Sequence, residues 1–234
     1  MLITNYDLNT STKYYIVKIS KTDGYTPKVY SPTGANKGAY TSLEVAKQTN
    51  SLICINAGLF NPKKGTYEPE GIIIENGNVI QNTQAVFYPD SMPLTINVDG
   101  DLWYAKNTID ADALIKEGIS SAVCGFMPII IDYNEVPEEQ WTKVHHYTNP
   151  HQRQIIGQLG NGDYMIITCE GRGYADSVGW TIHDAQRICK MYNLKFAYNL
   201  DGGTSTELVV NGIQINSCYE RDVERFSSTF IIFC

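Results

Sequence analysis

Three short turns constrain the fold of this chain more than any other feature of its sequence. The stretches "GIIIENGNVI", "LTINVDGDLWYA" and "TELVVNGIQI" are apolar runs interrupted at Asn76-Gly77, Asp99-Gly100 and Asn211-Gly212. Asn-Gly and Asp-Gly pairs favour two-residue β-hairpin turns, because they tolerate the positive φ that such turns require. The sequence therefore predicts three hairpins and a large share of antiparallel sheet.

The rest of the chain adds strands and a few helices. Further strands are predicted at residues 13–20, 51–58, 163–171, 195–200 and 228–233. Helices are predicted at residues 40–50, 109–118 and 180–193, with Thr41 and Glu44 spaced as a capping box and Thr181 as a candidate N-cap. The polar segment 133–152 is predicted to be a long surface loop. We therefore predict an α+β fold, a single domain over residues 1–234, in which a few helices cover a largely antiparallel or mixed sheet.

The composition indicates an acidic globular protein. Of the 234 residues 43% are hydrophobic, which is enough to bury a substantial core. The net charge is −7 and no basic cluster interrupts the acidic background, so we expect no nucleic-acid polymer as a partner. Neither a signal-peptide pattern nor an apolar run of about 20 residues is present, so we expect no membrane contact and a cytoplasmic or phage-associated location. The residue usage is also compatible with a bacterial or phage origin.

The cysteines and histidines suggest neither a metal site nor a cofactor. The six cysteines form no Cys-x-x-Cys pair and most lie in apolar runs, so buried free thiols are expected, although an even number leaves disulfides open. His145, His146 and His151 do not have the spacing of a zinc site and are expected to be solvated, whereas His183 is expected to serve a helix or the core.

Polar residues gather at the ends of four predicted strands. The stretches are "INAGLFN" with Asn56, "PHQRQIIG" with Arg153, "CEGRGYADSVGWT" with Glu170 and Arg172, and "NLDGGTST" with Asp201. A loop at the end of a strand can hold functional groups on a rigid base. Any one of these stretches alone is equally typical of an ordinary turn.

In their order along the chain, these stretches resemble the phosphodiester glycosidase family, which occurs in many bacterial and phage proteins. The strongest match is "NLDGGTST", and the others are "INAGLF", "EGIIIENG", "QRQIIG", "EGR", "SVGWT" and "ERFSSTFIIF". The resemblance covers roughly residues 50–234. The chain departs from the family around Arg153, where Gln152, Gln154 and Ile155 are unusual neighbours. It also has Glu170 where aspartate is common, Thr204 in place of a glycine, and an additional carboxylate at Glu207.

The resemblance implies a hydrolase that cleaves a sugar 1-phosphodiester at or next to the anomeric centre, with an anionic phosphosugar as its substrate. Such a substrate needs guanidinium groups, backbone N–H groups of a glycine-rich turn and hydroxyl donors, together with carboxyl groups for proton transfer or attack. The candidate catalytic residues are Asp201, with Glu70 and Glu170 as partners. The candidate substrate-binding residues are Asn56, Arg153, Arg172, Asn199, Gly202, Gly203, Ser205, Thr206 and Arg225. We expect them to converge on one locally positive pocket.

Several alternatives stay open at this level. Asp201 is also a good turn-former, Asn56 is as well suited to bonding the backbone as to contacting a ligand, and the two arginines are also typical of structural ion pairs. A non-catalytic module that binds a phosphosugar or a wall polymer is the main functional alternative. A third is an intracellular protein that cleaves or sequesters a nucleotide-like phosphosugar. The sequence does not choose between cleavage of C1–O and of P–O, and it does not indicate an oligomeric state.

Overall fold

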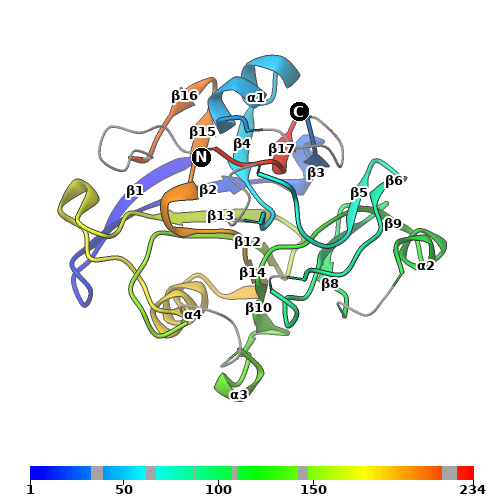
Figure 1. Cartoon of the computed structure of the whole chain (residues 1–234). Coiled ribbons are helices and arrows are strands. Elements are labelled where there is room, and N and C mark those ends of the chain that lie inside the picture. Colours follow the sequence, from blue (N-terminus) through cyan, green and yellow to red (C-terminus); the bar gives the residue numbers. More distant parts are fainter. Residues whose placement is uncertain (33–38, 62–66, 87, 107–109, 142–146, 218–225) are drawn as a thin grey trace.

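The computed structural model describes residues 1–32, 39–61, 67–86, 88–106, 110–141, 147–217 and 226–234 (Figure 1). In these ranges the strands are β1 Leu2–Asp7, β2 Thr12–Ile19, β3 Pro27–Tyr30, β4 Ile53–Asn56, β5 Ile73–Glu75, β6 Asn78–Gln81, β7 Leu94–Asn97, β8 Leu102–Tyr104, β9 Ile119–Val123, β10 Met127–Ile131, β11 Asn134–Glu135, β12 Arg153–Leu159, β13 Tyr164–Cys169, β14 Leu194–Asn199, β15 Leu208–Val210, β16 Ile213–Gln214 and β17 Phe230–Phe233. The α-helices are α1 Ser42–Thr49, α2 Ala111–Lys116, α3 Glu138–Trp141 and α4 Ile182–Met191.

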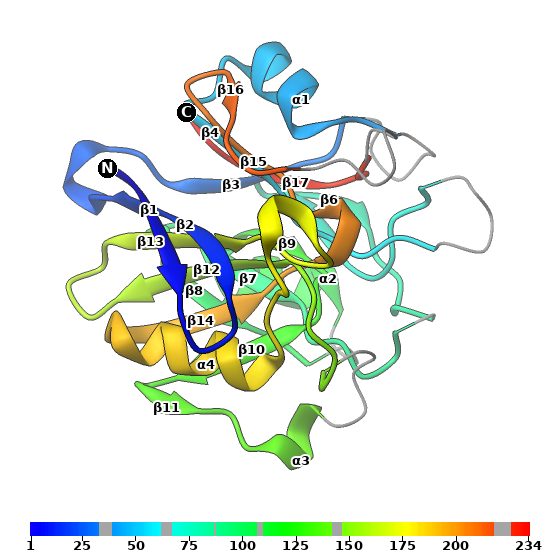
Figure 2. The same cartoon turned by 90° about the vertical axis from the view of Figure 1, so that its left-hand side faces the viewer.

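The described strands form three antiparallel sheets. The central sheet has the order β1-β2-β13-β12-β14-β10-β11, the second sheet the order β16-β15-β4-β17-β3, and the third sheet the order β6-β5-β9-β7-β8. Figure 2 shows the layers from top to bottom as α1, the second sheet, the central sheet and α4. The third sheet lies beside them and carries α2 (Figure 1). The predicted α+β class with a few covering helices is confirmed.

Period-2 alternation divides the central sheet between two cores. In β2 the side chains of Tyr15 and Val17 face the core that the three sheets share, whereas Tyr14 and Ile16 face the core under α4. The same alternation holds in β12, where Ile156 belongs to the shared core and the neighbouring residues face the opposite side. Both faces of this sheet are therefore buried, and its strands read as nearly continuous apolar runs.

The helix-capping predictions are confirmed. Thr41 and Glu44 form a capping box at the start of α1, and Thr181 forms one with Asp184 at the start of α4. Each box satisfies backbone N–H groups that have no partner inside the helix. The two helices therefore begin at defined residues, which fixes the chain segments that enter them.

Two of the three hairpin turns are as predicted. Asn76-Gly77 and Asn211-Gly212 have positive φ at both positions, as a two-residue turn requires. The prediction of a two-residue turn at Asp99-Gly100 is wrong: the Asn97 N–H bonds the Asp101 carbonyl at 3.1 Å, which leaves a three-residue loop. Only Gly100 has positive φ there, at 81°.

The prediction of an unbroken loop over residues 133–152 is also wrong. This segment contains β11 and α3, while residues 142–146 lie outside the described residues. Val136 between the two elements is 3% exposed, and its N–H bonds the Ile129 carbonyl at 3.0 Å. One buried side chain thus anchors a segment whose composition is otherwise typical of a loop.

Four of the six cysteines are buried free thiols, as predicted: Cys54, Cys124, Cys169 and Cys189. Cys234 is free but exposed, and Cys218 lies outside the described residues. His183 is exposed rather than part of the core, and its Nε2 lies 3.6 Å from a carboxylate oxygen of Glu138. Of the described helices, none has the length and apolar character needed to cross a membrane.

Candidate functional site

The stretch "NLDGGTST" leaves β14 and turns past the beginning of β12. The Leu200 N–H bonds the Gln154 carbonyl and the Gly203 N–H bonds the Gln152 carbonyl, both at 2.9 Å. A Cβ on Gly202 would lie 2.8 Å from the Gln152 carbonyl oxygen, and Gly203 has a φ of +61°. The first glycine is needed for the close approach and the second for the backbone conformation.

Asn56, at the end of β4, is completely buried and holds this loop at two points. Its Nδ2 donates to the Asp201 carbonyl at 2.8 Å, and its Oδ1 accepts from the Glu207 N–H at 2.9 Å. Both polar atoms of the amide therefore bond backbone groups. In this arrangement Asn56 positions Asp201.

The Asp201 carboxyl lies within the loop rather than in open solvent. The Asp201 N–H bonds the Ala57 carbonyl at 3.0 Å, and the Gly202 N–H donates to Asp201 Oδ1 at 2.9 Å. Burial raises the pKa of the Asp201 carboxyl to about 7, although Gly202, the Ser205 side chain and the charge of Arg172 all act to lower it. Asp201 is thus a group that takes up and releases a proton near neutral pH, which suits general acid or base catalysis.

The backbones of Glu70 and Asp201 are attached to the same short segment, residues 57–59. The Glu70 N–H bonds the Leu59 carbonyl at 2.9 Å, two residues beyond the Ala57 carbonyl that holds Asp201. Two residues of extended chain span at most about 7 Å. Glu70 is 9% exposed, and its Oε2 accepts from the Val86 N–H at 2.7 Å. The structure therefore attaches two candidate catalytic residues to one segment of the chain, with the Glu70 carboxylate bonded to Val86.

A cavity of about 280 Å³ is lined by Glu70 and a second acid, Glu68, together with polar side chains that include Asn61, Thr83 and Gln84. Amides, hydroxyls and carboxylates of this kind hydrogen-bond polar groups such as sugar hydroxyls. The cavity thus adds a polar, acidic surface around Glu70.

Tyr88 belongs to this site although nothing in the sequence distinguishes it from the other tyrosines. Its ring packs edge-on against Phe126, at 5.5 Å between centroids, and the Phe126 N–H bonds the Asn199 carbonyl at 3.1 Å. Burial and the negative charges of Asp201 and Glu70 raise the pKa of Tyr88 to about 12. The phenol therefore lies close to both carboxylates and keeps its proton at neutral pH.

Arg172 supplies positive charge to the glycine-rich loop. A Cβ on Gly203 would lie 3.2 Å from an Arg172 guanidinium nitrogen, and Arg172 Nε donates to His151 Nδ1 at 2.9 Å. Burial lowers the pKa of Arg172, while the nearby Tyr174 and Asp201 act to raise it. His151 is thus half-buried in contact with this arginine rather than solvated as predicted.

Arg153 is 4% exposed and its guanidinium bonds backbone carbonyls. Its Nε donates to the Trp180 carbonyl at 2.9 Å and its Nη2 to the Asn149 carbonyl at 3.0 Å. Burial lowers the pKa of Arg153 to about 10, and the charge of Arg172 acts in the same direction. These contacts join β12 to the segments before it and before α4. They place the Arg153 guanidinium near that of Arg172 but not directly on the Asp201 loop.

Glu170 is completely buried at the end of β13, on the shared-core side. Its Oε1 accepts from the Tyr15 hydroxyl at 3.1 Å and from the Ser217 N–H at 2.8 Å. No described residue bonds its Oε2. Burial raises the pKa of Glu170, opposed by Ser217, Tyr15 and the charge of Lys13. One strand, β12, lies between β13 and β14, so the two strands are about 10 Å apart. Glu170 therefore lies at the same end of the sheet as Asp201 but is not its direct neighbour.

Replacing Glu170 by glutamine is expected to raise Tm at pH 8 and to leave it nearly unchanged at pH 4. The raised pKa means that the folded protein holds this proton more tightly than the unfolded chain, so stability is lost as pH rises above the ordinary value of 4.5. Glutamine keeps an oxygen for Tyr15 and Ser217 but has no charge to bury. Thermal unfolding at the two pH values tests this. The control Glu170→Ala, which loses both hydrogen bonds, should melt at a lower temperature at both pH values; a Glu170→Gln protein that does the same would contradict the prediction.

The remaining candidate residues are Ser205, Arg225, Asn199 and Thr206. Ser205 lies in the loop with its side chain toward Asp201, and Arg225 lies outside the described residues. Asn199 Oδ1 and Thr206 Oγ1 are buried without a partner among the described residues, as are Gln152 Oε1 and Gln154 Nε2, which the sequence analysis did not select. Buried polar atoms normally have partners. These four atoms lie on or directly before the strands that carry the loop, and a bound water or ligand would satisfy them.

Glu207 has a structural contact that explains its position. Its carboxylate accepts from the Ser42 N–H at 2.5 Å, at the first turn of α1. A carboxylate at a helix N-terminus is stabilised by the unpaired N–H groups and the helix dipole. The additional acid of this chain therefore attaches α1 to the second sheet.

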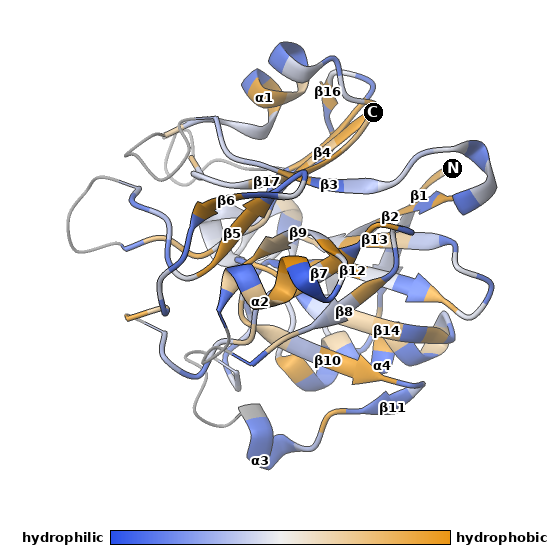
Figure 3. Ribbon diagram, turned by 90° about the vertical axis from the view of Figure 1, so that its right-hand side faces the viewer, coloured by the Kyte–Doolittle hydropathy of each residue, from blue (hydrophilic) through white to orange (hydrophobic). Residues whose placement is uncertain are grey.

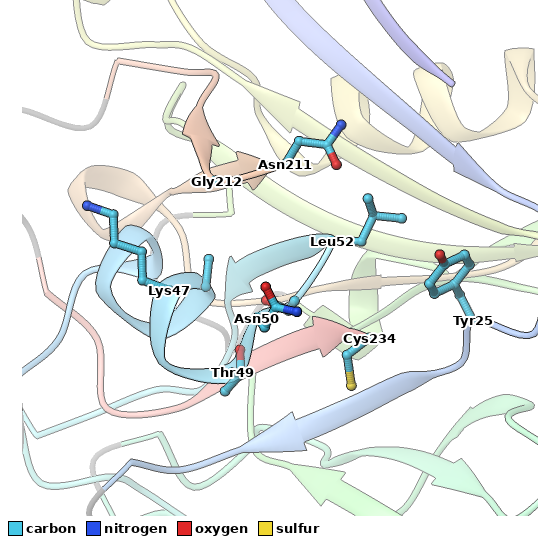
Figure 4. A pocket seen from close by; sticks show the side chains of 10 residues that line it. Tyr25, Lys47, Thr49, Asn50, Leu52, Asn211, Gly212 and Cys234 are labelled. Carbon is cyan, nitrogen blue, oxygen red and sulfur yellow. The ribbon is translucent and has the colours of Figure 1, made fainter.

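Within the described residues no group of three or more His, Cys, Asp or Glu side chains lies together as a metal site would require. A hollow of about 680 Å³ lies at the end of α1, where Tyr25, Asn50, Asn211 and Cys234 surround it (Figure 4). It contains none of the predicted site residues. Volume alone therefore does not identify the functional site, and the Asp201 carboxyl beside Arg172 does so better.

The described part of the chain is thus an antiparallel α+β scaffold that holds Asp201 and the Arg172 guanidinium at a glycine-rich turn. The sequence profile of the family described as phosphodiester glycosidase matches residues 49–233, and the chain belongs to this family.

Solved structures with low sequence identity share the fold. The catalytic domain of zebrafish N-acetylglucosamine-1-phosphodiester alpha-N-acetylglucosaminidase, auto-inhibited by its pro-peptide, superimposes with a TM-score of 0.76 at 18% identity, over 99% of this chain and 81% of that one. A hypothetical protein from Synechocystis gives a TM-score of 0.72 at 12% identity, over 99% of this chain and 61% of that one.

One curated relative is described as an uncharacterised protein. The SPbeta prophage-derived protein YomE of Bacillus subtilis is 28% identical over 228 residues, which is 90% of this chain and 35% of that protein. The chain thus spans about a third of the length of the curated relative it matches.

Proposed function

We propose that the protein hydrolyses a sugar 1-phosphodiester at or next to the anomeric centre. The observation that carries this proposal is the placement of the Asp201 carboxyl in a glycine-rich turn that the Arg172 guanidinium approaches, with burial raising the pKa of this carboxyl to about 7. Two carboxyl groups on either side of a substrate are what hydrolysis at an anomeric carbon requires.

Each group has a role in this proposal. Arg172 and the N–H groups of the glycine-rich loop bind the diester anion, because guanidinium and clustered N–H groups favour phosphate oxygens. Asp201 exchanges a proton with the leaving oxygen or the attacking water, and Glu70 serves as its partner. Tyr88 donates a hydrogen bond between them. Asn56 acts on the reaction by fixing the Asp201 backbone. Glu170, which is not a direct neighbour of Asp201, has no direct role in the proposed reaction.

Family membership and the zebrafish relative support this substrate class, since that enzyme's name specifies an N-acetylglucosamine 1-phosphodiester. Similarity to a prophage-derived protein supports the bacterial or phage setting proposed from composition. The cavity lined by Glu68 and Glu70 suits the hydroxyl groups of the sugar better than the phosphate, because its acids would repel the anion.

The test is incubation with methyl and uridylyl phosphodiesters of glucose, galactose and N-acetylglucosamine in isotopically labelled water. Mass spectrometry of the products identifies both the reaction and the bond. Label in the free sugar means cleavage of C1–O, and label in the phosphate means cleavage of P–O. Binding of these compounds without any product would reject the hydrolase and favour the phosphosugar-binding module.

A further inference from the structure

A groove separate from the Asp201 site lies where the third sheet meets the central sheet, at the end of β14 that is remote from Asp201. It encloses about 410 Å³ and is lined by Trp103, Phe196, Asn97, Asp101, Glu117 and Lys195, among others. Figure 3 shows β7, β8 and β14 side by side on this face of the molecule. The volume falls in the range of about 300 to 1,000 Å³ typical of ligand pockets.

An exposed aromatic platform forms one wall of this groove. The Trp103 side chain is 41% exposed although its ring packs on Phe196, which is 2% exposed, at 5.4 Å between centroids. Tyr104 lies parallel to Phe196, 6.4 Å away. The buried Phe196 ring and the half-buried Tyr104 ring support the indole from behind, while much of its surface faces outward. Trp combines a large apolar surface with an N–H donor, which suits ligands that have both an apolar face and a polar edge.

The polar groups around the platform are also fixed. Gln158 accepts from the Leu102 N–H at 3.0 Å and donates to Asp101 Oδ1 and to the Gly162 carbonyl, each at 3.1 Å. Lys21 Nζ lies 2.6 Å from the same Asp101 oxygen, and this hydrogen bond holds the pKa of Asp101 below its usual range. Asp101 is thus an ionised acceptor held in place, and its side chain is 52% exposed.

The negative charge of the groove disfavours an anionic sugar 1-phosphodiester, the substrate proposed for the Asp201 site. Among its lining residues Asp101 and Glu117 are negative and Lys195 is positive, and Lys21 already pairs with Asp101. A phosphate would meet this acidic rim without a guanidinium to bind it. A neutral ligand with hydroxyl groups would find acceptors and a donor at the rim, and the indole ring for its apolar face.

We propose that this groove binds a neutral pyranose unit of a glycan chain, stacked on Trp103, with its hydroxyl groups directed to Asp101, Glu117 and Lys195. The site is separate from the Asp201 loop. Phe196 lies near the start of β14 and Asp201 just beyond its other end, about 15 Å away along the strand. A glycan chain held there would keep the protein on a polysaccharide independently of what the Asp201 site does.

Calorimetric titration of the full chain with cellotetraose, maltotetraose and chitotetraose tests the proposal. Wild type is expected to bind at least one of them with a Kd of roughly 1 mM or tighter. Trp103→Ala should weaken this binding at least about tenfold, because stacking on the ring provides most of the contact. Trp103→Phe, which keeps a ring, should retain part of the affinity.

Two controls make the result specific to the groove. Val98→Ala alters an exposed residue of the same hairpin that does not line the groove, and Asp201→Asn alters the other site; both should bind as wild type does. Absence of binding to all three tetrasaccharides at about 10 mM would overturn the proposal. Equal affinity of wild type and Trp103→Ala would overturn it too, whether or not the hydrolase activity is found.

Discussion

Replacing Asp201 by asparagine is expected to lower kcat at least about a hundredfold on a verified sugar 1-phosphodiester. Asparagine fits the same turn and its side-chain oxygen can still accept the Gly202 N–H, but it cannot exchange a proton. Loss of a positioned acid or base lowers kcat and kcat/KM together. Steady-state kinetics on wild type and variant give the comparison. Unchanged kcat would mean that Asp201 only forms the turn.

The same substitution is expected to leave Tm unchanged at pH 4 and to raise it at pH 8. The folded-state pKa of about 7 exceeds the ordinary aspartate value of 3.8, so the folded protein binds more protons than the unfolded chain between these values. Wild-type stability therefore falls as pH rises from about 4 to about 7, whereas asparagine has no such dependence. Thermal scans at both pH values measure the difference. A variant that melts well below wild type at both pH values would show that the carboxylate is needed to build the loop.

Asp132→Asn is the matched control. Asp132 is an exposed turn aspartate with φ of 47°, a conformation that asparagine adopts readily, and it follows β10 at the end of the sheet remote from Asp201. Its replacement should leave kcat unchanged. A fall in kcat for both variants would indicate a general loss of folded protein.

Replacing Asn56 by alanine is expected to destabilise the protein by about 2 to 4 kcal/mol. The change leaves the Asp201 carbonyl and the Glu207 N–H without their bonds in a region that water does not reach freely, and it leaves a small void. For a chain of this size the expected fall in Tm is roughly 5 to 15 °C. Circular dichroism or calorimetry measures it.

The Asn56 variant should also lose turnover at temperatures where it is still folded, because Asp201 is no longer held by its backbone. Asn78→Ala is the control, since Asn78 is an exposed strand asparagine with one long side-chain contact, 3.4 Å to the Asn76 carbonyl. It should change neither Tm nor kcat by much. An Asn56→Ala protein with wild-type Tm would show that its two hydrogen bonds contribute little to stability.

Local signals in the sequence predicted the parts of the fold that depend on neighbouring residues. The Asn-Gly turns and the two capping boxes follow from residues three or fewer positions apart, so they survive in the structure. The third hairpin differs because the Asn97 side-chain oxygen accepts from the N–H groups of Asp99 and Asp101, a contact that stabilises the longer loop. The short β11 and α3 were missed since one buried valine, rather than a periodic pattern, holds them.

The candidate site was predictable in its residue types but not in its arrangement. The motif identified Asp201 and the resemblance identified Asn56 and Arg172, and these lie together. Sequence could not indicate that both amide atoms of Asn56 bond the backbone, that Arg153 turns toward two carbonyls, or that Tyr88 approaches both carboxylates. Each of these depends on where a distant segment passes, which the pattern of one strand does not determine.

The pairing of β17 between β3 and β4 has a consequence for how the molecule assembles during synthesis. Asn56 pairs with Phe230, and the Ala57 N–H bonds the Thr229 carbonyl, so the segment that holds Asp201 and Glu70 has an open edge until β17 is made. Pairings between residues so far apart in sequence form slowly, after local structure. All strands of the central sheet precede β17 in the chain, so they are synthesised before the segment that holds Asp201 gains its partner on this edge.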